Sequence, residues 1–249
     1  MYFTDRGIEE LQRRRGEEEI SLDWLAERLR EFVDLNPEFE TPIERLATWL
    51  ARLDDPEDKV EDPERIRAAI VAWRSQLSDG LGSNIVRPLD WDEHCGDYVT
   101  ARPNWDGFGS LILWAAYDDH KDLQPPARFV ELAGDPAYQR ATAKEAESLY
   151  PHLIRDVEFW LPSPFDFTFK AEGPNGDVVT FGSAMTLLRH LQELNDRTWK
   201  ADRPTIEAWG VTAPKPGGPL EEAAKYGFSD MFILAEMACE RGMPIKLDY

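Results

Sequence analysis

The sequence is poor in cysteine and has no long apolar run. Its two cysteines, Cys95 and Cys239, are too few for a disulfide framework. No stretch approaches the roughly 20 consecutive apolar residues of a transmembrane helix. The start, MYFTDRGIEEL, lacks the basic and apolar segments of a secretory signal. These features predict a cytoplasmic protein with reduced thiols and no membrane association.

Basic residues are scarce compared with acidic ones. The chain has 28 lysines and arginines against 48 aspartates and glutamates, which gives a formal net charge of −20 at pH 7. Such a field repels nucleic acids and anionic membranes and attracts basic proteins. The basic cluster Arg13-Arg14-Arg15 is followed by Glu17-Glu18-Glu19 and is compensated by it. We therefore expect a basic protein partner and no nucleic acid, although a general need for solubility explains the same charge.

The signatures of familiar catalytic and cofactor sites are missing. There is no Gly-x-Ser-x-Gly elbow, no P-loop and no Gly-x-Gly-x-x-Gly after a strand. His-Glu-x-x-His and Cys-x-x-Cys are absent as well. The sequence therefore predicts no cofactor and no metal, and it leaves open whether the protein is an enzyme.

The composition is that of a globular protein, with 42% hydrophobic and 11% aromatic residues, nine of them tryptophan. We predict an α+β fold in which an N-terminal helical module precedes a larger domain with a small antiparallel sheet, built on a hairpin over residues 165–182 and packed by helices. Phe165, Phe167 and Phe169 alternate with polar residues, as in a strand with one buried face. A turn at residues 173–176 leads to a second strand at residues 178–181.

The hairpin leads into an amphipathic helix. Ser183 can cap this helix, whose apolar stripe consists of Met185, Leu187, Leu188, Leu191 and Leu194. We further predict helices over residues 108–117, from Asp135 to about Tyr150, and over residues 220–241. Gly227 could interrupt the last of these helices, and Gly242 ends it. Strands are expected at residues 85–86, 98–101, 156–161 and 243–249.

The N-terminal segment, residues 1–55, reads as a separate helical unit. Ser21 can cap a helix that Asn36-Pro37 ends. A second helix begins at Thr41, where a capping box is joined to a proline at the first helical position. The acidic, proline-containing segment 54–64 is the predicted linker, so the predicted domains are residues 1–55 and 64–249. The helix after the linker should bury five residues: Ile66, Ala69, Ile70, Trp73 and Leu77.

The N-terminal run contains the strings YFTDRG, WLAERL, FVDLNPEFE and ERLATWLARLDD. Through them it resembles a family of short, uncharacterised acidic helical proteins of actinomycete bacteria. The resemblance covers residues 1–55, and it implies a portable helical module fused to a different domain. It implies no activity.

Two groups of residues are candidates for a binding site. In the module they are Glu17, Glu18, Glu19 and Trp24, which lies off its helix's apolar stripe. In the larger domain the candidates are Trp91, Asp92, His94, Trp105, Asp106 and His120. The second group contains residue types that bind Zn²⁺ or Fe²⁺, but its spacing matches no metal motif. His152 and His190, among apolar neighbours, are interpreted as core or rim histidines.

The leading hypothesis is a non-enzymatic protein that binds a basic partner, such as an immunity-like or antitoxin-like inhibitor or an adaptor. Its support is the charge, the tryptophan content and the absence of a catalytic signature. The alternative is an enzyme or a small-ligand-binding protein that uses the region from Trp91 to His120.

Overall fold

The structure is a computed structural model that describes residues 22–36, 43, 63–86, 88–92, 99–101, 104–143, 146–215 and 217–247. Contacts within the chain divide it into two compact units, Met1–Asp62 and Pro63–Tyr249. The boundary between them falls inside the predicted linker.

In the N-terminal unit the structure describes one long helix, α2 (Leu22–Leu35). The helix ends just before Pro37, as predicted, since the residue preceding a proline is disfavoured in helical geometry. The side-chain amide of Asn36 donates to the carbonyl of Phe32 at 2.9 Å and satisfies a group that the helix end leaves open. The predicted Ser21 cap and, apart from Ile43, the start of the second helix lie outside the described residues.

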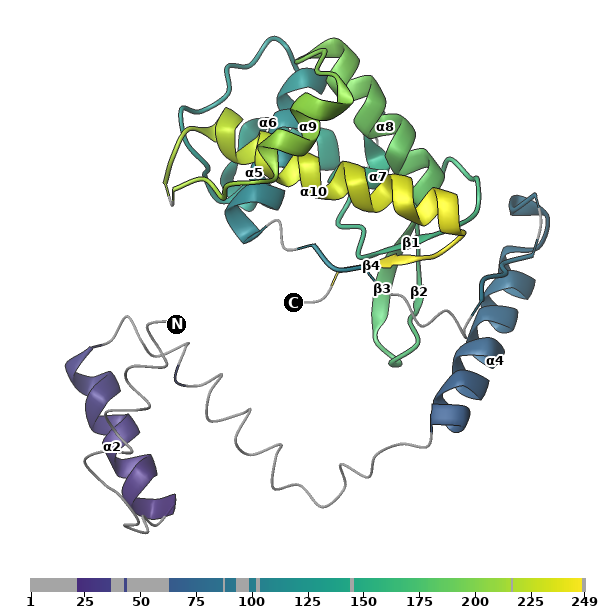
Figure 1. Ribbon diagram of the computed structural model, residues 1–249, viewed down its shortest axis with the longest axis horizontal. Helices are drawn as coiled ribbons and strands as arrows, with labels where there is room; N and C mark the ends of the chain where they lie inside the picture. Colours follow the sequence, from purple (N-terminus) through teal and green to yellow (C-terminus); the bar gives the residue numbers. More distant parts are fainter. Residues whose placement is uncertain are drawn as a thin grey trace. The chain divides into compact units, whose positions relative to one another are not determined.

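The C-terminal unit contains a four-stranded sheet in the order β2-β3-β1-β4 (Figure 1). Its strands are β1 (Phe159–Leu161), β2 (Phe169–Glu172), β3 (Val178–Ser183) and β4 (Ile245–Lys246). The hairpin β2–β3 is antiparallel, whereas β1 pairs parallel with β3 and antiparallel with β4. The predicted α+β class is thus confirmed. The sheet is mixed rather than wholly antiparallel, because β1 and β3 run parallel.

The first hairpin strand begins at Phe169 rather than at Phe165. The carbonyls of Ser163 and Phe165 accept hydrogen bonds from Ser183 Oγ at 2.6 Å and Thr186 Oγ1 at 2.7 Å. These side-chain bonds tie the segment to the junction of β3 and the following helix, and residues 163–168 form no strand. The predicted alternation fails there, and Phe167 is 37% exposed.

Seven helices and two short 3₁₀ turns are described in this unit. They are α4 (Pro63–Leu81), η2 (Gly82–Asn84), α5 (Asn104–Asp119), η3 (Leu132–Gly134), α6 (Pro136–Thr142), α7 (Pro151–Ile154), α8 (Ala184–Arg197), α9 (Arg203–Trp209) and α10 (Leu220–Arg241). The predicted cap of α8 is confirmed, since Ser183 Oγ accepts the N–H of Thr186 at 3.1 Å. The predicted end of α10 is also confirmed, because Gly242 has a φ of 64°.

Helix α10 is continuous through Gly227, so the glycine does not break it. A Cβ at position 227 would lie 2.3 Å from the carbonyl oxygen of Gly107 on α5. The glycine therefore allows α10 to contact the backbone of α5, its main packing partner.

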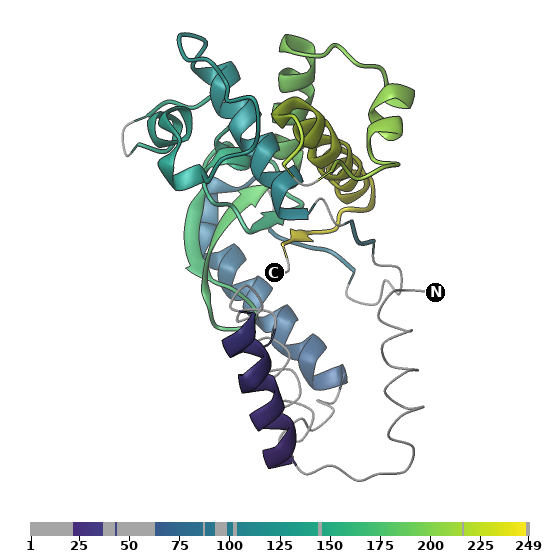
Figure 2. The same cartoon turned by 90° about the vertical axis from the view of Figure 1, so that its left-hand side faces the viewer.

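Three further predictions are corrected. The helix that begins after Asp135 ends at Thr142, and a separate helix begins at Pro151, whose preceding residue is not helical. Residues 85–86 and 99–101 form no strand. In α4 the first half is not buried: Ile66 is 39% exposed, and only the later residues, including Trp73 and Leu77, pack against the core. Figure 2 shows the first half of α4 running past the sheet.

The sheet separates two apolar clusters. Trp160 points to one face and packs with α5, α7, α8 and α10, while its neighbours Phe159 and Leu161 point to the other face. That second face is covered by the end of α4 and by the loop that contains Trp91. None of the helices in the described residues is long and apolar enough to cross a membrane.

Candidate functional site

The candidate residues of the larger domain that the structure describes do not gather in one site. Trp91 is buried in the cluster under α4, and the guanidinium carbon of Arg74 lies 4.9 Å from its ring centroid. Asp92 is exposed, and Asp106 is half-buried in the first turn of α5. His94 and the side chain of Trp105 lie outside the described residues. Among the described residues no group of three or more His, Cys, Asp or Glu could hold a metal ion.

The end of α5 carries a buried carboxylate that is fully engaged. Asp118 accepts hydrogen bonds from Tyr150 Oη and Arg197 Nε, both at 2.6 Å, and pairs with Lys121 at 3.3 Å. Burial opposes its ionisation, but these hydrogen bonds outweigh burial and lower the pKa of Asp118 below its ordinary value. Nearby, His120 is half-buried in the turn that follows α5. Asp118 therefore fastens α5 to the Tyr150 loop and to α8.

The module candidates lie mostly outside the described residues, which include none of Glu17, Glu18 and Glu19. Trp24, on α2, is half-buried and interacts with other residues of the protein.

His152 and His190 are core histidines, as predicted. Their ring centroids lie 5.4 Å apart, and both side chains are buried. His152 Nδ1 accepts the N–H of Ser183 at 2.8 Å. Burial lowers the pKa of His152 to about 4 and that of His190 to about 3, so both rings are neutral at pH 7. Because both rings are buried, a substrate cannot reach them, and we interpret them as part of the core and not as a binding or catalytic site.

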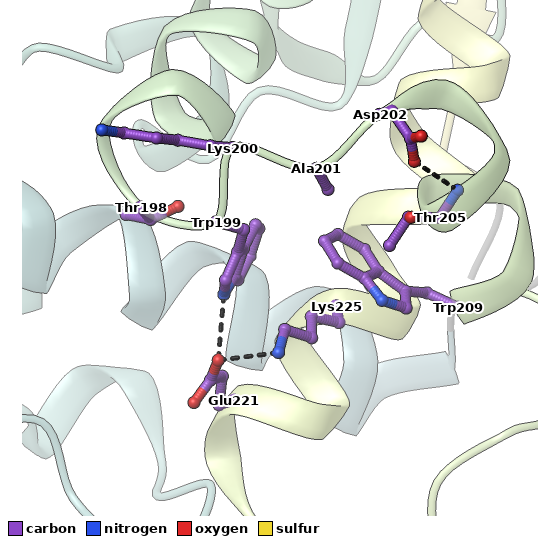
Figure 3. A pocket seen from close by; sticks show the side chains of 9 residues that line it. All are labelled: Thr198, Trp199, Lys200, Ala201, Asp202, Thr205, Trp209, Glu221 and Lys225. Atoms are coloured by element: carbon purple, nitrogen blue, oxygen red, sulfur yellow. Dashed lines mark hydrogen bonds and ion pairs between the residues drawn. The ribbon is translucent and has the colours of Figure 1, made fainter.

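A different part of the unit carries an open hollow of about 650 Å³ on its surface (Figure 3). We call it the tryptophan hollow. It is lined by residues 198–202, by Thr205 and Trp209 on α9, and by Glu221 and Lys225 on the first turns of α10. Its volume lies in the range of typical ligand sites.

Local sequence shapes the loop at the edge of this hollow. After α8 the chain turns at Lys200, whose φ of 52° is unusual for a residue other than glycine. The Asn195 side chain holds the turn by bonding to both the N–H and the carbonyl of Ala201. Asp202 then caps α9 by accepting the N–H of Thr205 at 3.1 Å, and Pro204 lies in the first turn.

Two indole rings form the wall of the hollow. Trp199 stacks on Trp114 with centroids 5.6 Å apart, and it meets Trp209 nearly edge-to-face at 5.3 Å. Phe228, which is fully buried, packs edge-to-face against both rings from the core side. Trp199 and Trp209 are each half-buried, so the core holds them rigidly while part of each ring reaches the surface.

A carboxylate and an ammonium group complete the site. Glu221 Oε1 accepts the indole N–H of Trp199 at 3.2 Å and pairs with Lys225 Nζ at 2.8 Å. Lys225 Nζ also lies 5.5 Å from the ring centroid of Trp209, within the range of a cation–π contact. Figure 3 shows Lys225 beside the two indoles, next to Glu221, and Lys200 directed away from them. The hollow therefore already contains one cation, held between an aromatic face and a carboxylate.

Sequence reasoning missed this site. Its one local signal is a pair of tryptophans ten residues apart on either side of the Asp202 cap and Pro204. Neither tryptophan indicates by its position in the sequence that Trp114, Glu221 and Lys225 will lie beside it.

Comparison with known proteins gives a family for the N-terminal part alone. Residues 1–58 match a family of unknown function (DUF6104), and this match covers the segment of the resemblance, residues 1–55. No family is assigned to the rest of the chain. Neither the curated proteins nor the solved structures gave a match. The tryptophan hollow thus lies outside the part that a family model covers.

Proposed function

We propose that this protein is a non-enzymatic interaction protein that binds a basic protein partner, and that the tryptophan hollow is its main docking surface. The observation that carries the proposal is the pair of half-buried indoles, Trp199 and Trp209, beside the carboxylate of Glu221 in an open hollow. Tryptophans held in this way at pockets are typical anchors of protein interfaces. An immunity-like or antitoxin-like inhibitor, or an adaptor, would need only such binding.

The charge of the chain supports the same proposal. A net charge of −20 accelerates the encounter with a basic protein and disfavours nucleic acid. Residues 1–62 carry half of it, with 19 acidic and 9 basic residues. We propose that Glu17, Glu18 and Glu19 of the module steer the partner toward the protein, and that Trp24 helps to hold the partner once it is bound.

The alternative is an enzyme or a small-ligand-binding protein that uses the region from Trp91 to His120. Two residues of that region are used in packing and do not face an open pocket. Trp91 is buried against Arg74, and Asp118 is held by Tyr150 and Arg197. We therefore favour the hollow.

The experiment has two steps. Full-length protein is used to capture partners from its host, and each captured protein is then purified and its direct binding measured at several salt concentrations. We expect a basic partner whose association rate falls steeply with salt. Trp209→Ala and Glu221→Gln should weaken its binding, while Glu240→Gln, at the far end of α10, should not. A neutral or acidic partner, or equal binding by all three variants, would refute the proposal.

A further inference from the structure

Lys225 occupies a position that is built for a cation. Its Nζ is 2.8 Å from Glu221 Oε1 and 5.5 Å from the ring centroid of Trp209. The same carboxylate oxygen is held in place by the indole N–H of Trp199. A cation at this point has an aromatic face on one side and an oriented negative charge on the other, which is the arrangement that proteins use to recognise basic side chains.

The lysine is held there weakly. The Lys225 side chain is 29% exposed and that of Glu221 is 47% exposed, so water screens their attraction. Ion pairs between side chains this exposed contribute little to stability. Both residues lie on α10, four positions apart, so this pair joins no two elements of the fold. Releasing Lys225 into solvent would leave the aromatic contacts among Trp114, Trp199 and Phe228 unchanged.

An arginine suits the position better than the lysine. A guanidinium group is planar, so it can lie flat on an indole while it pairs with both oxygens of a carboxylate. An ammonium group makes a single point contact. With Lys225 outside and Lys200 already directed away, the carboxylates of Glu221 and Asp202 would give the hollow a net negative charge.

We infer that Lys225 is an internal occupant of the hollow, and that an arginine side chain of the partner takes its place on Trp209 and Glu221 when the complex forms. This inference rests on the proposed function and specifies its chemistry. Lys225 then acts as a competitor: it keeps the aromatic face covered in the free protein and lowers affinity for cations that make no further contacts.

The test uses a probe that carries one guanidinium group, N-acetylarginine N-methylamide, because an arginine-rich peptide would bind to any acidic surface. Binding is followed by NMR through the indole N–H signals of Trp199 and Trp209, which are assigned with the variants Trp199→Phe and Trp209→Phe. We expect saturable shifts of these two signals. Lys225→Met should tighten binding about fivefold, which corresponds to the loss of a competitor held by about 1 kcal/mol.

Lys200→Met is the matched control, because it makes the same change in charge at the edge of the same hollow. It should tighten binding less than twofold, and Glu221→Gln should weaken it in the Lys225→Met background. The norleucine analogue of the probe, which has no charge, should shift neither signal. Equal effects of Lys200→Met and Lys225→Met would overturn the inference, because the gain would then follow net charge alone. Absence of the indole shifts in the Lys225→Met protein would also overturn it.

The outcome is separable from that of the proposed function. If Trp209→Ala abolishes binding of the captured partner while Lys225→Met changes neither partner nor probe binding, the proposed function stands and the exchange is wrong. If the probe binds as expected but the captured partner is indifferent to Trp209→Ala, the cation site stands and the proposed docking surface is wrong.

Discussion

The backbone N–H of Ser183 donates to Nδ1 of His152 at 2.8 Å, and both residues are fully buried. The bond fastens α7 to the junction of β3 and α8. We expect His152→Leu to destabilise the protein by about 1–3 kcal/mol, because the N–H of Ser183 would lose its acceptor without gaining water. His190→Leu is the control, since within the described residues His190 Nδ1 has no hydrogen-bond partner to lose. Urea unfolding at pH 7.5 measures the difference, and equal losses would contradict the assigned role of His152.

The same pair of histidines predicts a pH dependence. Burial lowers the pKa of His152 to about 4 and that of His190 to about 3, against an ordinary value of about 6.5 in the unfolded chain. Their contribution to stability is therefore complete above pH 6.5. It is lost as the pH falls toward these folded values, because the unfolded chain takes up protons that the folded protein cannot.

Each histidine should reduce the free energy of unfolding by up to about 1.4 kcal/mol per pH unit in this window. The free energy of unfolding is measured with urea between pH 7 and pH 5.5, before most carboxylates titrate. Plotted against pH, it should fall less steeply for His190→Leu than for the unmodified protein. Identical slopes would show that folding does not lower the pKa of His190.

Two glycines should respond to alanine in opposite directions. Gly227→Ala places a methyl group 2.3 Å from the carbonyl oxygen of Gly107, so α10 must move away from α5. We expect a loss of about 1–3 kcal/mol or more. Gly80→Ala, near the end of α4, meets no atom within 4 Å and should stabilise by roughly 0.5–1 kcal/mol. Thermal melts of both variants test the close contact of the two helices, and a harmless Gly227→Ala would disprove it.

Removing the side chain of Asp118 should cost more stability than removing the hydroxyl of its partner Tyr150. Tyr150→Phe removes one hydrogen bond and should cost about 1 kcal/mol. Asp118→Ala should cost about 3 kcal/mol, because it leaves the Tyr150 hydroxyl buried without a partner and Arg197 without its carboxylate. Since the hydrogen bonds lower the pKa of Asp118, its contribution is present at neutral pH and disappears as the pH falls through that lowered value. Unfolding free energies of the two variants at pH 7 and pH 3 provide the measurement.

The predicted linker can be tested by cleavage. Limited proteolysis should cut between Asp54 and Glu64, and the released C-terminal fragment should retain a cooperative melt. The expectation follows from the acidic linker and from the division of the chain at Asp62. A fragment that unfolds would show that the module shares its core with the rest of the chain.

The steering role proposed for the module predicts an effect on rate alone. Replacing Glu17, Glu18 and Glu19 by Gln should slow partner association roughly two- to fivefold at low salt and leave dissociation nearly unchanged. The control replaces three exposed glutamates of the C-terminal unit, Glu131, Glu147 and Glu240, by Gln. Stopped-flow association rates compare the two triple variants. Equal slowing by both would show that total charge, and not the module, steers the partner.

Several local features were predictable from the sequence. Ser183 caps α8, Asp135 caps α6, Gly242 ends α10, and α8 buries Leu187, Leu191 and Leu194 at helical spacing. Each depends on a few neighbouring residues, because capping, φ preference and apolar periodicity act within one or two turns of the chain. The resemblance over residues 1–55 has the same origin, since it rests on continuous strings of sequence.

Other features were decided by contacts between distant segments. Phe165 resembles a strand residue, but its carbonyl is taken by Thr186, so the hairpin begins later. Gly227 resembles a helix breaker, but it becomes the point at which α10 meets Gly107 of α5. The tryptophan hollow forms only when α9 packs on α10 and brings Trp209 and Lys225 together beside Trp199. The sequence by itself therefore determined the fold class and the ends of many elements, whereas the candidate site was decided by tertiary packing, because the indoles, the carboxylate and the ammonium that form it come from segments that meet only in the folded chain.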